Sequence, residues 1–162
     1  MNNNIAVLLP YKDQFVKNNA GSASIWVKDF SKTSKFKKST VVFGYTSNTD
    51  NIFNNFKYVN LKFNNFGVQS KNLKYVDKFV DVLKQKKFSL IEIHNRPSYI
   101  LHIEKYLPNN KYILVIHNNP QTLRGAVTTK ERTRLLKICN KIIFVSNWVK
   151  EKFFEGLEIK NH

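Results

Sequence analysis

Two histidines, His94 and His117, are the residues whose type and spacing most clearly suggest chemistry. Each stands in the same phrase of seven residues, at 91–97 and 114–120: an aliphatic residue, any residue, Ile, His, Asn, any residue, Pro. Each phrase is typical of a buried parallel strand that ends in a polar turn, because proline cannot donate to a ladder of strands. The histidines are 23 positions apart, which suits one β-α-β unit, so both turns should lie at one edge of a sheet. In open α/β sheets that edge is where ligands bind.

Several uses of this histidine pair are open. A metal site would need further ligands, but His102 lies along a predicted helix, His162 is terminal and no carboxylate has ligand spacing, so no metal is predicted. A general base is possible, since Glu92 shares a face with His94 if the strand stays regular. The pair could also bind a sugar hydroxyl or a phosphate, or simply bond to nearby backbone.

Two further positions could add polar groups to the same edge. Gly21 and Ser22 stand where a helix would begin and point free backbone N–H groups at the sheet edge, which suits phosphate or sugar oxygens, although a plain helix start explains them equally well. Ser146 follows a predicted strand and could contribute its N–H and hydroxyl, although capping the next helix already explains a serine there.

Alternating strands and helices would position these residues. Strands are predicted at 5–10, 39–45, 56–63, 88–94, 111–117 and 141–145, and helices at 25–35, 72–86, 97–107, 128–138 and from 147 onward. Asn95 is the expected N-cap of the helix containing Pro97, Thr128 and Glu131 have capping-box spacing, and 118–127 is a loop. The pattern predicts one α/β domain over 1–162, with a doubly wound, mostly parallel, Rossmann-like sheet.

The glycines and the cysteine exclude several functions. The five glycines are too far apart for a dinucleotide-binding fingerprint or a P-loop. Cys139 is the only cysteine, so neither a disulfide nor a thiolate metal site is possible, and its expected role is core packing.

The net charge of +16 would attract any anionic surface or polymer. The lysines are scattered through the chain, which suits simple compositional bias. One basic stripe, Lys28, Lys32 and Lys35, lies on a predicted helix and could be a solvated face or face anionic lipid. Nucleic acid is the least favoured partner, because no binding signature is present. With no basic leader and no apolar run near the roughly 20 residues of a membrane span, a cytoplasmic protein is expected, with a peripheral position at the inner face of the membrane as an option that the charge leaves open.

The order of these segments resembles the amino-terminal half of family 4 glycosyltransferases of the GT-B fold. The resemblance rests on 114–120, on Lys141 to Lys150 after a basic helix, on Ile5 to Pro10 with the later Gly21, and on Leu90 to His94. It implies a retaining, metal-independent enzyme that moves a sugar from a nucleotide-sugar donor to a glycan or lipid-linked acceptor.

The resemblance also implies roles for single residues. Gly21 and Ser22 would lie near the donor phosphates, His117 would contact the donor sugar, and Ser146 would line the cleft. The acceptor would face His94, Asn95, Arg96 and Asn118.

The sequence departs from the family pattern in two respects. Gly21 stands between Ala20 and Ser22, where the family usually has paired glycines. The carboxyl-terminal domain, with its nucleotide site, its Lys/Arg pair and its two spaced glutamates, is not encoded within 1–162, so this half is expected to be inactive alone. The alternative is a non-catalytic basic α/β module that binds anionic membrane or, less favoured, nucleic acid.

Overall fold

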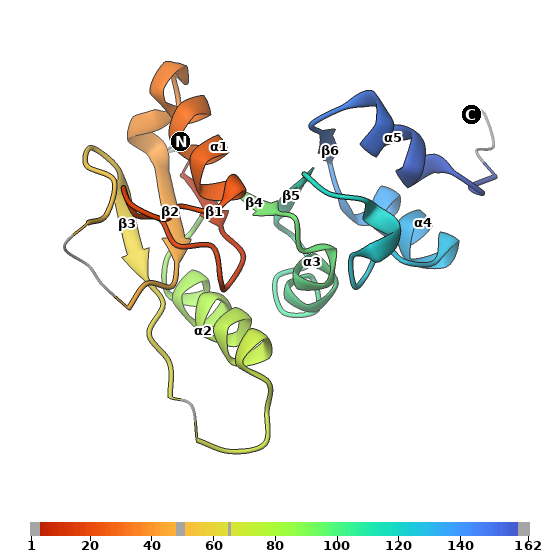
Figure 1. Cartoon of the computed structure of the whole chain (residues 1–162). Coiled ribbons are helices and arrows are strands. Elements are labelled where there is room, and N and C mark those ends of the chain that lie inside the picture. Colours follow the sequence, from red (N-terminus) through yellow and green to blue (C-terminus); the bar gives the residue numbers. More distant parts are fainter. Residues whose placement is uncertain (1–3, 48–50, 65, 159–162) are drawn as a thin grey trace.

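A six-stranded, all-parallel sheet organises the computed structural model, which describes residues 4–47, 51–64 and 66–158. The strands lie side by side in the order β3-β2-β1-β4-β5-β6, as Figure 1 shows. Their bounds are β1 Ile5–Leu8, β2 Thr40–Gly44, β3 Lys57–Asn60, β4 Leu90–His94, β5 Lys111–Ile116 and β6 Lys141–Phe144. This sheet confirms the predicted Rossmann-like, doubly wound fold, with its switch point between β1 and β4.

Helices lie on both faces of the sheet because the chain reverses direction at that switch point. From β1 the chain passes through α1 (Ser22–Thr33) to β2 at one side, and from β3 it crosses through α2 (Lys71–Gln85) to β4 at the other. Right-handed crossovers in opposite directions must place their helices on opposite faces. The remaining helices are α3 Pro97–Ile103, α4 Thr129–Ile138 and α5 Asn147–Phe154.

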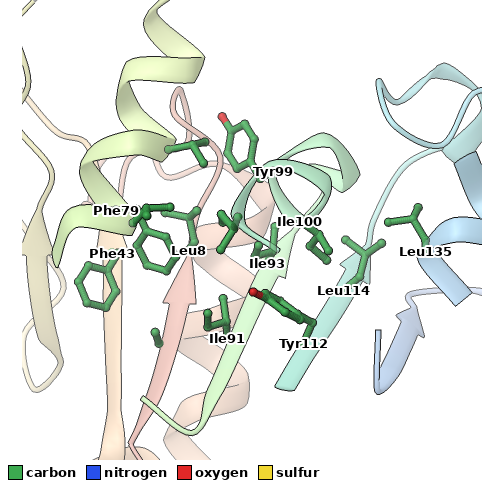
Figure 2. Close-up of a cluster of buried hydrophobic side chains, with 14 of the residues drawn as sticks. Leu8, Phe43, Phe79, Ile91, Ile93, Tyr99, Ile100, Tyr112, Leu114 and Leu135 are labelled. Carbon is green, nitrogen blue, oxygen red and sulfur yellow. The ribbon is translucent and has the colours of Figure 1, made fainter. Parts of the chain in front are cut away.

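The larger core lies between the sheet and α2 to α5. Apolar residues at three- and four-residue spacing put one side of α2, including Phe79, onto the sheet. Figure 2 shows side chains of this core, among them Leu8, Ile93 and Leu114 on neighbouring strands and Ile100 on α3. This packing fixes the positions at which β4 and β5 end.

The opposite face is covered only in part. On the side of α1 that faces the sheet, the α1 residues Ala23 and Val27 pack on Val7, Leu9 and Val42. Over β4 to β6 an apolar hollow of about 510 Å³ remains open beside α1. Its lining includes Trp26, Phe30, Phe36, Leu90, Ile113 and Ile143. Helices therefore cover this face over β1 and β2 and leave apolar surface exposed over β4 to β6.

Some predicted element ends are correct and others are wrong. Thr128 and Glu131 form the expected capping box. Asn95 is not the N-cap of α3: Arg96 holds that position, and Asn95 adopts a left-handed conformation with φ 52°. The predicted loop at 118–127 contains a short 3-10 helix, η2 (Pro120–Thr122), and a second, η1 (Lys37–Ser39), was not predicted.

Candidate functional site

The two predicted histidines meet at the carboxyl ends of β4 and β5. Nδ1 of His94 lies 3.1 Å from Nε2 of His117. Strand β4 stays regular, so Glu92 shares a face with His94, and its Oε1 lies 2.8 Å from Nε2 of His94. His94 is fully buried, while the Glu92 side chain keeps 14% exposure. The three side chains therefore form one hydrogen-bonded row, Glu92 to His94 to His117.

Trp26 on α1 encloses this row from the side facing the helix. Its ring centroid lies 5.1 Å from that of His94 and 6.1 Å from that of His117, edge-on to the latter. Phe30, one helical turn further on, stacks on Trp26 at 4.7 Å. The sequence analysis did not identify Trp26 as a site residue. The sequence signal that could have identified it is an aromatic residue shortly after the start of a helix that begins at the predicted binding edge.

His117 lines an open hollow of about 630 Å³ between the start of α1 and the end of β6. The other lining residues are Ser22, Ile25, Trp26, Asp29, Phe30 and Val145. Ser22 and His117 thus line one hollow. Most of its other walls are apolar or aromatic, which suits the hydrophobic face of a sugar ring or a similar ligand with a few directed polar contacts.

Burial lowers the pKa of His117 to about 4 from its ordinary value of 6.5. Repulsion between the two rings when both are protonated lowers this pKa further, and the carboxylates of Asp13 and Glu92 partly oppose the shift. The imidazole of His117 is therefore neutral near pH 7. A neutral ring is suited to hydrogen bonding with a hydroxyl, whereas it offers no charge to a phosphate and is a weak general base at that pH.

The start of α1 is organised by Asp13, which the sequence analysis did not identify. Its carboxylate accepts hydrogen bonds from the backbone N–H groups of Ala23 (3.1 Å) and Ser24 (3.3 Å). These two groups are therefore not free for a phosphate, and the nearby carboxylate would repel one. Gly21 is the N-cap, and a Cβ there would lie 2.4 Å from Cγ of Asp13. Gly21 thus allows this carboxylate to approach the helix.

Asn95 joins the two histidine turns. Its Oδ1 accepts hydrogen bonds from the backbone N–H groups of His117 (3.4 Å) and Asn118 (3.3 Å), and the residue is buried. Its side chain and the fully buried ring of His94 are thus engaged inside the protein, which differs from the acceptor contacts predicted for both. Asn118 is exposed, and Arg96 is half-buried with its guanidinium donating to the carbonyl of Asn95 at 2.9 Å.

The other predicted site residues lie at the periphery. Ser146 is exposed at the end of β6 and caps α5 by accepting a hydrogen bond from the N–H of Val149 at 3.2 Å. In the predicted basic stripe, Lys28 and Lys32 each lie 3.2 Å from the carboxylate of Asp29. These two ammonium groups have an internal partner, which favours a solvated face over a lipid-facing one.

The described part of the chain offers neither a metal centre nor a membrane-spanning helix. Within it no cluster of three or more His, Cys, Asp or Glu side chains could hold a metal ion, and no helix is long and apolar enough to cross a membrane. His102 pairs with Asp77 at 2.7 Å, away from the histidine row, and His162 lies outside the described residues.

Comparison with known proteins adds no assignment to this geometry. No protein-family model matches the chain, and no curated protein matches it.

Proposed function

We propose that this chain is the acceptor-side half of a retaining glycosyltransferase, which moves a sugar from a nucleotide-sugar donor to a glycan or lipid-linked acceptor. The observation that carries the proposal is His117, a neutral imidazole on an open hollow at the carboxyl edge of a parallel sheet. Ligands of open α/β sheets bind at this edge. The Rossmann-like fold is the one that the sequence resemblance implies, and the resemblance supplies the reaction class.

In this proposal His117 binds a hydroxyl of the donor sugar. A half-buried neutral imidazole can make a directed hydrogen bond with little cost of desolvating a charge. Trp26 offers an aromatic surface beside it, against which the apolar face of a sugar ring can pack. Ser22 adds a hydroxyl to the lining of the same hollow. These contacts orient the sugar and leave nucleotide binding to a second domain.

The donor phosphates need a revised location in this account. Asp13 already occupies the N–H groups of Ala23 and Ser24, and its carboxylate lies against Gly21, where it would repel a phosphate. The phosphates would instead lie toward the second domain, with Ser22 contacting the sugar. A domain that closes over the hollow would also exclude water from the reaction.

The experiment begins with the reading frame after His162. A frame that encodes a second α/β domain with two spaced glutamates is expected, and the complete polypeptide should transfer sugar from one member of a nucleotide-sugar panel. Residues 1–162 alone should give no transfer. A folded two-domain polypeptide that binds no nucleotide sugar would contradict the proposal.

A further inference from the structure

We propose that Glu92 is a positioning residue: acting through His94, it fixes the tautomer of His117, so that Nδ1 of His117 is presented to a ligand as a hydrogen-bond acceptor. The sequence resemblance assigns no role to Glu92. The inference rests on the row of three side chains at 2.8 Å and 3.1 Å. Only the identity of the ligand rests on the proposed function.

The direction of the row follows from which atoms can donate. A carboxylate is an acceptor only, so the contact with Glu92 requires a hydrogen on Nε2 of His94. In the proposed state His94 is a neutral imidazole with its one hydrogen on Nε2, so its other nitrogen, Nδ1, carries no hydrogen. Nδ1 of His94 must then accept from Nε2–H of His117.

The same reasoning assigns the free nitrogen of His117. A neutral imidazole carries one hydrogen, and the contact with His94 places it on Nε2. Nδ1 of His117 is therefore an acceptor, and it makes no hydrogen bond with any other described residue. It can accept from a hydroxyl or amide donor in the hollow, and it discriminates against groups that only accept, such as a phosphate dianion.

The packing around the row prevents the rings from turning over. Trp26 lies against both imidazoles, and the amide of Asn95 holds the backbone of His117. A flipped His94 ring would place carbon atoms against Glu92 and His117 and lose both hydrogen bonds. The tautomer is therefore fixed by the contact between Glu92 and His94 together with this packing.

The test is nuclear magnetic resonance of the chain with 15N-labelled histidine, which reports directly which ring nitrogen carries hydrogen. In the wild-type chain at pH 7 both His94 and His117 should carry hydrogen on Nε2 only. Hydrogen on Nδ1 of His117 would overturn the proposal, and this outcome needs no variant. The measurement does not depend on sugar transfer, so its failure and that of the proposed function are distinguishable.

Variants then test the role of the carboxylate. Glu92→Leu should convert the single His117 tautomer into a mixture, while Glu104→Leu, which removes the carboxylate of the C-cap residue of α3, should leave the tautomer unchanged. In the complete transferase, Glu92→Leu should lower kcat roughly ten- to hundredfold, the range for groups that orient a functional histidine from behind. A folded Glu92→Leu chain with the wild-type tautomer of His117 would overturn the role of Glu92.

Discussion

Nδ1 of His94 lies 3.1 Å from Nε2 of His117, although the two rings come from different strands. This contact gives the two histidines different roles. His94 is fully buried between Glu92 and His117, whereas His117 reaches the hollow. The pair therefore has one member that lines the hollow and one buried member behind it.

A glycine should be required at position 21 because the Asp13 carboxylate lies against it. The backbone conformation of Gly21 does not itself require a glycine. Its φ of −77° suits any residue, but a Cβ would displace the Asp13 carboxylate and its two hydrogen bonds to α1. Gly21→Ala should lower the free energy of unfolding by about 1–2 kcal/mol, the usual value of a helix cap. In an Asp13→Ala background the same change should be neutral or stabilising by about 0.5 kcal/mol. Urea unfolding of the four chains measures this coupling, and additive effects would contradict it.

The stability of the protein should depend on pH through His117. Its pKa is about 4 in the folded chain and near 6.5 when unfolded, so the unfolded chain binds more protons between these values. Stability should therefore fall as the pH falls from about 6.5 to about 4. His117→Gln should remove this part of the dependence, and His102→Gln, with its partly exposed ring, is the matched control. Parallel stability curves for wild type and His117→Gln would rule out the shifted pKa.

Arg132 on α4 should stabilise the carboxyl-terminal part of the domain. Its buried guanidinium donates to the carbonyls of Ala126, Val127 and Glu155 at 2.7 to 3.1 Å. Arg132→Met leaves these carbonyls without that donor and should cost about 3 kcal/mol. Arg134→Met removes an exposed arginine two residues away and should cost less than about 1 kcal/mol. Equal losses in thermal unfolding would contradict this difference.

Gly125 and Gly67 allow the cost of backbone strain alone to be compared with the cost of strain combined with a steric clash. Both have positive φ, 90° and 94°. A Cβ at Gly125 would lie 2.6 Å from the backbone nitrogen of Ser98, whereas nothing lies within 4 Å of one at Gly67. Gly67→Ala should cost about 1 kcal/mol, and Gly125→Ala about 2–4 kcal/mol because the rigid start of α3 must also move. Chemical denaturation checks the order, and a smaller loss at Gly125 would contradict it.

The sequence was sufficient to predict the structure where the interactions that determine it are local. Apolar runs located all six strands, and Thr128 with Glu131 located the start of α4. It was insufficient where a side chain forms a hydrogen bond with a residue that is distant in the sequence. Asn95 looked like a helix cap, but its oxygen bonds to backbone more than 20 residues away, at the next strand end. Asp13 caps α1 from a polar segment without any periodic pattern.

The same distinction applies to the candidate site. The repeated phrase placed His94 and His117 at one sheet edge, and regular alternation in β4 brought Glu92 to His94. The phrase did not indicate which histidine would be buried: His94 is fully buried, whereas His117 lines the hollow. The sequence therefore located the pair, and the tertiary packing separated their roles.

The most direct measurement is sugar transfer by the complete polypeptide, with His117→Ala compared with wild type across a nucleotide-sugar panel. We predict transfer from one donor, with kcat lowered at least roughly tenfold in His117→Ala, because a hydrogen bond that orients the sugar is lost. Circular dichroism should report an unchanged fold in the variant. Unchanged kinetics in His117→Ala, or no transfer by a folded wild-type enzyme with any donor, would contradict the account.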